Sequence, residues 1–427
     1  MKTDTFHLRC VCARHPCVVQ LHDRLEARVT LGTIWQDYLA AAAWESERSL
    51  ARPRTAYPHY SENGHWVTLD IEHRSAWNGN FYDHGNWTAG FRFGVTWLLA
   101  LGSSDAKIAR LAHERLADLS TRADDATTHD LGFLFYPSFA LGMESGFVTR
   151  QEAGPALTAA RMMVRRYNAC GDYIQAFGPI GDSRSAGTST IDTMMNLPLL
   201  WWAFAYSLDP AIYEVARRHA RTSARLFLRD DASTYHLSTF NQDSGAIVRR
   251  GTYQGAGDTS CWSRGQAWAL CGFAWSYAAT GEVEFLTAAE RVGSYFWAHL
   301  PADGVVPWDF SDTSPHAARD ASASAIAALG ALILGYVHPD PDAAMRHDRL
   351  ARALLGRLGD AALNRDEHID GILLHSCYSW PHRLGLDGAT AWGDFYFGLA
   401  LAAANGCVDL RALASTARTL SEVSCHG

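Results

Sequence analysis

The chain alternates between two kinds of helical segment. In one kind, apolar residues occupy every face; in the other, they occupy one face with polar residues opposite. The apolar segments share a Trp or Asp at the start and small residues in the first turns, and they begin near Trp87, Asp130, Asp192, Trp262, Asp320 and Asp394. Amphipathic segments alternate with them at 31–44, 105–122, 149–167, 211–228, 282–299 and 343–363.

This alternation predicts the fold class. A helix that is apolar all round needs complete burial, whereas an amphipathic helix keeps one face in water. The apolar segments recur about every 40 to 75 residues, the spacing of a helical hairpin with a variable loop. We therefore expect an all-α (α/α)6 barrel of six inner and six outer helices, in one domain over 31–427 after an N-terminal extension at 1–30. Strand-like residues at 229–260 predict a small β-hairpin excursion between helices.

Composition narrows the range of partners. The chain has 427 residues, of which 48% are hydrophobic and 19% are charged, as in a well-buried globular protein. Its net charge is −8 and it has no basic stripe, which argues against nucleic acid and acidic membranes. No apolar run reaches about 18 residues, and 1–17 has no apolar signal core, so we expect no membrane span and a cytoplasmic location. The expected oligomeric state is a monomer or a homodimer.

The nine cysteines favour free thiols, because their number is odd and no Cys-x-x-Cys pair occurs. Cys10, Cys12 and Cys17 lie near His7 and His15, but their spacing matches no common zinc site. The phosphate-binding glycine loop and the HExxH and GxSxG motifs do not occur either. We therefore expect neither a metal nor another cofactor.

In the predicted barrel, all six inner helices start at one end and form a funnel there. Its lining would comprise Trp87, His129, Asp130, Asp192, Trp262, Arg264, Trp268, Asp320 and Asp394. Two carboxylates facing one cleft are the minimum for glycoside chemistry, because one can donate a proton while the other activates water or attacks. Asp130 and Asp192 are the best pair, since each precedes a bulky apolar run. We expect Ser189 and Thr190 to cap the helix that begins at Asp192.

Other residues of the funnel have both structural and functional interpretations. Asp320 and Asp394 are competitors for the catalytic role, but we expect Asp320 to pair with its neighbour Arg319, and Asp394 to cap its helix. Arg264 could bind a carboxylate, either that of a substrate or that of an aspartate in the same funnel. The 15 Trp and 16 Tyr favour a ring-lined cleft of the kind that holds sugars, and the tryptophans that could stack on a sugar or fill the core are Trp87, Trp262, Trp268 and Trp308.

Four motifs stand in order along most of the chain. They are His-Asp-Leu-Gly-Phe at 129–133, Ile-Asp-Thr-Met-Met-Asn-Leu-Pro-Leu-Leu at 191–200, Trp-Ser-Arg-Gly-Gln-Ala-Trp at 262–268 and Trp-Gly-Asp-Phe-Tyr at 392–396. Together they resemble the unsaturated glucuronyl hydrolases, a family of glycoside hydrolases. The resemblance implies an (α/α)6 barrel without a metal.

The resemblance also implies a reaction. Enzymes of this family act on oligosaccharides, such as glycosaminoglycan fragments, that a polysaccharide lyase has left with a 4,5-unsaturated uronic acid at the non-reducing end. Asp192 would protonate C4 of the vinyl ether and help water to add at C5. The resulting hemiketal would open to a keto acid and release the saturated partner. Asp130 would assist through the substrate hydroxyls and the developing charge.

The substrate-binding positions implied by the resemblance are Trp87, His129, His236, Thr252, Gln254, Trp262, Arg264, Trp268 and Trp308. Two departures are visible. Phe177 stands where relatives often carry a Trp, which removes an indole N–H donor. Ser376 and Ser379 lie where members that accept sulfated sugars carry a Ser-rich motif that ends in Lys. Pro381 or His382 follows here, and this weakens the expectation of a sulfated substrate.

Three alternatives remain open at this point. A related unsaturated rhamnogalacturonyl hydrolase would share the fold, although the Met-Met-Asn-Leu-Pro string argues against it. An inverting glycosidase of saturated sugars would need two carboxyl groups about 6.5–9.5 Å apart, with room for a water. A non-catalytic sugar-binding barrel would have no need for both Asp130 and Asp192.

Overall fold

The computed structural model describes residues 31–74 and 85–424. The predicted N-terminal extension at 1–30, with its cluster of cysteines and histidines, lies outside the described residues. Helices make up most of the described chain, which confirms the expectation of a mainly helical fold. Within those same ranges, no helix combines the length and the apolar character needed to cross a bilayer.

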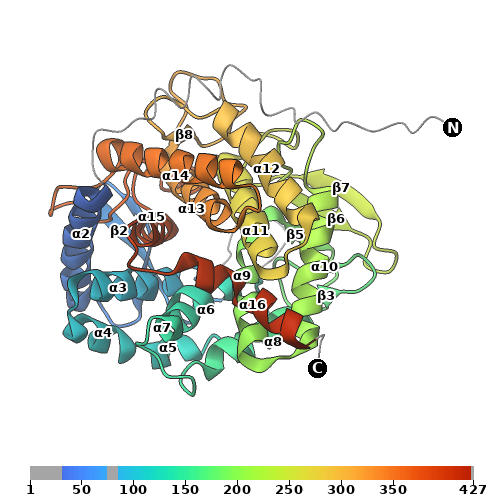
Figure 1. Cartoon of the computed structure of the whole chain (residues 1–427), viewed down its shortest axis with the longest axis horizontal. Coiled ribbons are helices and arrows are strands. Elements are labelled where there is room, and N and C mark those ends of the chain that lie inside the picture. Colours follow the sequence, from blue (N-terminus) through green and yellow to red (C-terminus); the bar gives the residue numbers. More distant parts are fainter. Residues whose placement is uncertain (1–30, 75–84, 425–427) are drawn as a thin grey trace.

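The apolar segments form a closed circuit, which we call the inner ring (Figure 1). Each member contacts the next in sequence, and the last contacts the first. In the described part of the chain its members are α3 (Ala89–Ser103), α6–η2–α7 (Leu131–Phe135, Tyr136–Ala140 and Leu141–Glu144), η3–α9 (Ile191–Met195 and Leu197–Ser207), α11 (Ser263–Thr280), α13 (Ala321–Val337) and α15 (Ala391–Ala404).

Amphipathic helices pack on the outside of the inner ring. They are α2 (Leu31–Ala51), α4 (Ala106–His113), α5 (Leu116–Ser120), α8 (Gly154–Arg165), α10 (Pro210–Leu226), α12 (Val283–Ala298) and α14 (Pro341–Ala361). The expected helix over 105–122 is thus divided into α4 and α5. The division of labour follows the pattern of residues: α11 is buried on all its faces, whereas α10 buries Ile212, Val215 and Ala216 and carries arginines on its wet side.

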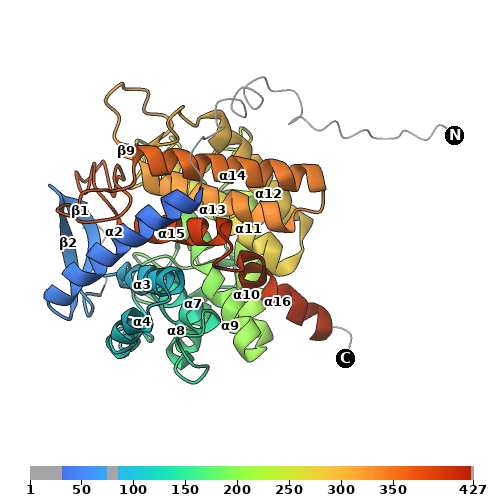
Figure 2. The same ribbon diagram turned by 60° about the vertical axis from the view of Figure 1, so that its left-hand side comes forward.

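Short β-elements lie between the helices. Two-stranded pairs are formed by β1 (Ala56–Glu62) with β2 (His65–Asp70), β3 (Tyr167–Asn168) with β4 (Tyr173–Ile174), and β8 (Val306–Pro307) with β9 (Arg319–Asp320). The β1–β2 hairpin contacts α3 and α15 and lies at one side of the molecule (Figure 2).

A three-stranded antiparallel sheet has the order β5-β6-β7. Its strands are β5 (Thr188–Thr190), β6 (Leu237–Phe240) and β7 (Ile247–Gly251). The β6–β7 hairpin confirms the excursion expected within 229–260, while β5 was not predicted. Ser189 pairs with Ser238, and Leu237 pairs with both Thr190 and Gly251.

The helix α16 (Leu410–Ser424) was not predicted either. It packs against α9, α11 and α13 and buries Leu410, Ala414 and Ala417. The guanidinium of Arg418 lies beside Gly281, the residue that ends α11. This helix therefore covers the end of the inner ring at which its helices finish.

A close contact between backbones brings two members of the inner ring together. A Cβ added to Gly132 would lie 2.4 Å from Cα and 2.5 Å from the carbonyl oxygen of Asn196. Gly132 follows Asp130 by two residues, and Asn196 follows Asp192 by four. The missing side chain therefore sets the separation of the two segments that carry the candidate carboxylates.

We expect Gly132→Ala to lower the free energy of unfolding by about 1–3 kcal/mol, because the added methyl group has no room between the two backbones. Urea denaturation followed by circular dichroism measures this change. Gly154→Ala on α8 is the matched control, since a Cβ there meets nothing within 4 Å, and it should leave stability unchanged or raise it. Equal unfolding free energies for the two variants would contradict the role of this contact.

Candidate active site

A pocket opens where the helices of the inner ring begin. Its lining residues are Trp87, His129, Asp130, Phe133, Phe177, Asp192, Tyr253, Gln254, Trp262, Arg264 and Trp268. Eight of the eleven residues expected from the sequence are among them. Asp320 and Asp394, also expected in the funnel, are not among the described residues that line this pocket.

Asp130 lies directly before α6 and is held by short polar side chains. The hydroxyl of Thr128 lies 3.1 Å from its Oδ2, and the amide of Asn196 donates to its Oδ1 over 3.3 Å. The Oδ1 of Asn196 accepts from the backbone N–H of Phe133, which fixes the orientation of that amide. These contacts hold the buried carboxylate in a defined position.

His129 is oriented by two partners. Its Nδ1 lies 2.8 Å from the hydroxyl of Thr193, and its Nε2 lies 3.3 Å from Oδ1 of Asp130. A neutral imidazole satisfies both contacts when Nδ1 accepts from the threonine and Nε2 donates to the carboxylate. Because Thr193 follows Asp192, this histidine links the two segments that carry the candidate carboxylates.

Asp192 lies in the 3-10 turn η3, immediately after β5. The expectation that Ser189 and Thr190 cap a helix is wrong, because both residues belong to β5 and pair with β6. The backbone N–H of Ile191 donates to the carbonyl oxygen of His236, which continues the ladder by one more bond. Oδ1 of Asp192 is buried and has no hydrogen-bond partner among the described residues.

The β5-β6-β7 sheet gathers further side chains at one edge. In this antiparallel order, the end of β5, the start of β6 and the end of β7 lie together. Asp192 follows β5, His236 precedes β6, and Thr252 and Gln254 follow β7. Nδ1 of His236 lies 2.8 Å from the hydroxyl of Thr252, and the imidazole lies against the indole of Trp262 with centroids 4.6 Å apart. His236 and Thr252 thus stand directly behind the lining.

Aromatic rings form the apolar wall of the pocket. The indole of Trp87 stacks on that of Trp392, with centroids 4.8 Å apart, and Phe133 contacts both Trp87 and Trp268. Trp308 lies apart from this wall: its Nε1 donates to Asp312, and its ring stacks on Trp380. Trp308 is therefore not among the described residues that line the pocket.

The pKa values of both candidate carboxyls are raised. Burial is the main cause for Asp130, and the charge of Asp192 adds to it. Burial is also the main cause for Asp192, although the positive charge of Arg264 opposes it. Since two buried carboxylates resist ionising together, the pair holds a proton at a pH where exposed carboxyls have lost theirs. A carboxyl that keeps its proton near neutral pH can act as a general acid.

The guanidinium of Arg264 is fully engaged with acceptors of the protein itself. It donates to Oδ2 of Asp320 and to Oε1 of Gln254, each over 2.6 Å, and to the carbonyl oxygens of Cys377 and Tyr378. Of the two roles considered for Arg264, pairing with an aspartate of the funnel is the one observed. Its geometry fixes the side-chain amide of Gln254 at the pocket wall.

Two expectations about the other aspartates are wrong. Arg319 pairs with Asp303 and not with Asp320, because successive side chains of strand β9 point to opposite faces. Asp394 does not cap α15, since the hydroxyl of Thr390 accepts from the first turn there. Oδ1 of Asp394 instead accepts from the backbone N–H groups of Ile372 and Leu373.

Several known proteins are similar to this chain over most of its length. No protein-family model matches the chain. The unsaturated glucuronyl hydrolase of Bacillus sp. (strain GL1) is 33% identical over 373 residues, which cover 85% of this chain and 95% of that protein. The unsaturated chondroitin disaccharide hydrolase of Streptococcus pyogenes serotype M1 is 35% identical, over 74% of this chain and 80% of that protein. The chain belongs to the unsaturated glucuronyl hydrolase family.

The fold of the family agrees with this assignment. The crystal structure of the unsaturated glucuronyl hydrolase from Streptococcus agalactiae superposes with a TM-score of 0.80 and 26% identity, over 94% of this chain and 97% of that chain. An aspartate-to-asparagine variant of the same enzyme has been solved in complex with dGlcA-GalNAc6S. The resemblance inferred from four motifs is thus confirmed, and the protein is a glycoside hydrolase of this family.

Some residues around the pocket of this family member were not predicted. Tyr253 lies between His236 and Phe177, with ring centroids 4.3 Å and 5.8 Å away. Its position between Thr252 and Gln254, two expected substrate-binding residues, could have indicated this from the sequence. Phe133 and Asn196 both lie inside the quoted motifs, but spacing alone does not show that one lines the pocket and the other orients Asp130.

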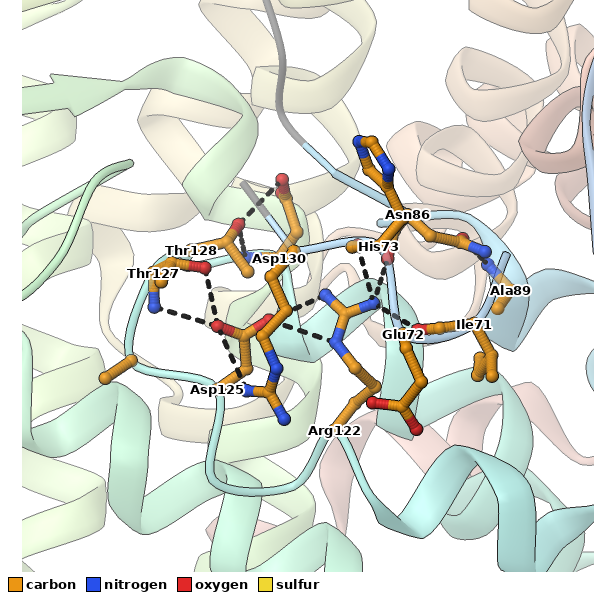
Figure 3. Close-up of polar contacts among 12 residues, drawn as sticks. Ile71, Glu72, His73, Asn86, Ala89, Arg122, Asp125, Thr127, Thr128 and Asp130 are labelled. Atoms are coloured by element: carbon orange, nitrogen blue, oxygen red, sulfur yellow. Dashed lines mark hydrogen bonds and ion pairs between the residues drawn. The ribbon is translucent and has the colours of Figure 1, made fainter. Parts of the chain in front are cut away.

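A buried arginine positions two of the chain segments that reach this pocket (Figure 3). Arg122 pairs with Asp125, and the carboxylate of Asp125 also accepts from the N–H and hydroxyl of Thr127. This fixes the turn that leads to Asp130. The same guanidinium donates to the carbonyl oxygens of Ile71, His73 and Asn86, the last of which precedes Trp87.

We expect Arg264→Ala to lower the free energy of unfolding by about 3–5 kcal/mol, because it leaves the buried carboxylate of Asp320 without its cation. Chemical denaturation measures this loss. The matched control is Arg319→Ala: its pair with Asp303 is largely exposed, so the loss should stay within about 1 kcal/mol. A small effect at Arg264 would mean that Asp320 is protonated or hydrated in the native protein.

We expect Asp130→Asn to stabilise the protein increasingly as the pH rises. The raised pKa means that the folded state binds more protons than the unfolded state above about pH 4, so parent stability falls with rising pH. An asparagine cannot ionise, and its advantage should reach about 0.5–2 kcal/mol near pH 8. Thermal unfolding across pH tests this.

Asp182→Asn is the control, because its expected effect on stability has the opposite sign. Hydrogen bonds from Arg184 lower the pKa of Asp182 to about 2, so that carboxylate stabilises the fold above about pH 4. Asp182→Asn should therefore be slightly less stable than the parent at neutral pH. If both variants shift in the same direction, burial does not raise the pKa of Asp130.

Proposed function

We propose that this protein releases a 4,5-unsaturated uronic acid from the non-reducing end of lyase-generated oligosaccharides of the glycosaminoglycan type. The observation that carries the proposal is the buried pair Asp130 and Asp192 in an aromatic-lined pocket, in a chain of the unsaturated glucuronyl hydrolase family. The name of the Streptococcus pyogenes relative, a chondroitin disaccharide hydrolase, supports the substrate class.

Asp192 is the proton donor in this proposal. Its carboxyl transfers a proton to C4 of the vinyl ether, and positive charge develops at C5 and on the ring oxygen. Water then adds its oxygen to C5 and returns a proton to Asp192, so water is added across the C4=C5 bond. The hemiketal opens to a keto acid, C1 becomes a hemiacetal, and the saturated sugar leaves. Burial raises the pKa of both carboxyls of the pair, so a proton is available there, and the unpartnered Oδ1 is the observation that favours Asp192 as the donor.

Asp130 acts beside it. It assists through the substrate hydroxyls and the charge that develops in the transition state, and the contact of its Oδ1 with Nε2 of His129, 3.3 Å away, keeps one oxygen in place. The aromatic side chains Trp87, Trp262 and Trp268 present faces on which a planar unsaturated ring can stack. Gln254, which Arg264 holds, and the pair His236 and Thr252 provide hydrogen-bonding groups for sugar hydroxyls.

The finer description of the architecture is also a proposal. The closed circuit of the inner ring and the amphipathic helices around it support an (α/α)6 barrel and a single catalytic domain over 31–427. A cytoplasmic location and a monomeric or homodimeric state stay predictions.

We expect Asp192→Asn to lower kcat by about 100- to 10,000-fold with little change in KM, because an amide can occupy the same space but cannot donate the proton. The measurement is the loss of the ultraviolet band of the conjugated C4=C5 uronate on a panel of unsaturated chondroitin, hyaluronan and heparin disaccharides. Asp360→Asn, at an exposed position of α14, is the matched control and should keep the parental rate.

A parental rate for Asp192→Asn would remove Asp192 from the role of proton donor. If the unsubstituted protein leaves the band unchanged on the whole panel, the proposed substrate class is wrong, and unsaturated rhamnogalacturonyl oligosaccharides are the next to test.

A further inference from the structure

Three potential metal ligands from three elements meet on the outside of the inner ring. They are Glu290 of α12, His338, which follows α13, and His347 of α14. One ligand atom of each lies within 4.8 Å of the other two. Oε1 of Glu290 and Nε2 of His338 are 3.1 Å apart. Ligand atoms about 2.0–2.1 Å from a tetrahedral zinc ion are separated by about 3.3 Å, so this pair already has a suitable spacing.

His347 is the least satisfied member of the group. Its Nδ1 is buried and has no hydrogen-bond partner among the described residues. Its ring lies beside that of His338, with centroids 5.8 Å apart, so the imidazole stands next to the other two potential ligands.

His338 has the supporting contact that a metal-bound histidine requires. Its Nδ1 lies 3.0 Å from the backbone nitrogen and 3.2 Å from the carbonyl oxygen of Asp340. In the first tautomer, Nδ1 accepts from the N–H of Asp340 while Nε2 donates to Glu290. In the second, Nδ1 donates to the carbonyl of Asp340 and the lone pair of Nε2 is available, which is the usual arrangement of a ligating histidine.

We propose that Glu290, His338 and His347 form a binding site for a divalent transition-metal ion such as Zn²⁺. Two imidazole nitrogens and one carboxylate are a common zinc ligand set, with water as the fourth ligand. The side chain of Glu290 is 41% exposed, so an ion and its water can reach the site from solvent. This inference departs from the expectation drawn from the sequence, which was that the protein holds no metal.

The position of the site indicates a structural and not a catalytic ion. The helix α13 has 17 residues and therefore spans about 25 Å between Asp320, beside the pocket, and His338. An ion at this distance does not touch the substrate. It would join α12 to the connection between α13 and α14, and so stabilise the outer helices against separation.

The test uses the untagged full-length protein after removal of metals with a chelator. Zn²⁺ is titrated by calorimetry and by thermal unfolding, and Co²⁺ serves as a spectroscopic probe. Because 1–30 carries three cysteines and three histidines, a Cys10→Ser, Cys12→Ser and Cys17→Ser triple variant removes that competing thiol cluster. His316→Ala, at an exposed loop position, is the matched control for His347→Ala.

The expected result is one bound Zn²⁺ that raises Tm in the parent, in the triple cysteine variant and in His316→Ala. His347→Ala should weaken this binding more than about tenfold, since even loss of an outer-shell partner costs about 10- to 100-fold. Glu290→Gln, a conservative change at a half-exposed position, should weaken it as well, which guards against a folding defect in His347→Ala. The Co²⁺ spectrum should show tetrahedral bands without thiolate charge transfer.

Two outcomes would overturn the proposal. One is unchanged Zn²⁺ affinity and Tm response in both His347→Ala and Glu290→Gln. The other is loss of all Zn²⁺ binding in the triple cysteine variant. Activity does not enter the readout, so failure here is independent of the proposed function.

Discussion

Keeping two carboxylates out of water is the constraint on which this structure depends. Burial of an ionised carboxylate costs several kcal/mol even after the protein relaxes. Asp130 and Asp192 are also close enough for the charge of Asp192 to raise the pKa of Asp130. A domain is stable by only about 5–15 kcal/mol, so this cost must be offset elsewhere. The helices of the inner ring supply that offset, because α11 and α13 bury nearly every side chain they carry.

Asp125 and Asp320 are buried carboxylates that have a cationic partner, which distinguishes them from Asp130 and Asp192. Asp125 is buried too, but Arg122 and Thr127 outweigh the effect of burial and its pKa is lowered. Asp320 has its own guanidinium in Arg264. Asp130 has hydroxyl, amide and imidazole neighbours, and neither Asp130 nor Asp192 has a guanidinium within hydrogen-bonding distance among the described residues. Asp394 is another buried carboxyl with a raised pKa and no guanidinium partner among those residues, but it does not line the pocket. Among the described residues of the pocket wall, Asp130 and Asp192 are the carboxyls with a raised pKa.

The helical pattern of the sequence predicts most of this arrangement, because the apolar and polar positions in each turn show which face of a helix must be buried. All twelve segments expected from the alternation are present as helices, and eight expected site residues share one pocket. The errors come from contacts that are distant along the chain. Ser189 and Thr190 have the residue types of a helix cap, yet pairing with β6 makes them a strand. Asp320 finds its cation 56 residues away in Arg264, although Arg319 is adjacent.

Two opposing effects on the pKa of Asp192 show why position along a helix does not determine whether a carboxyl is ionised. A place near the start of a helix favours the ionised form by about 0.3–1 kcal/mol, and it does so chiefly within the first turn. Asp192 precedes α9 by a full turn of η3, so even that contribution is weakened. Burial acts in the opposite direction and can shift a pKa by up to about 3–5 units. Desolvation therefore prevails, and the pKa of Asp192 is raised although the residue lies in the helical turn that precedes α9.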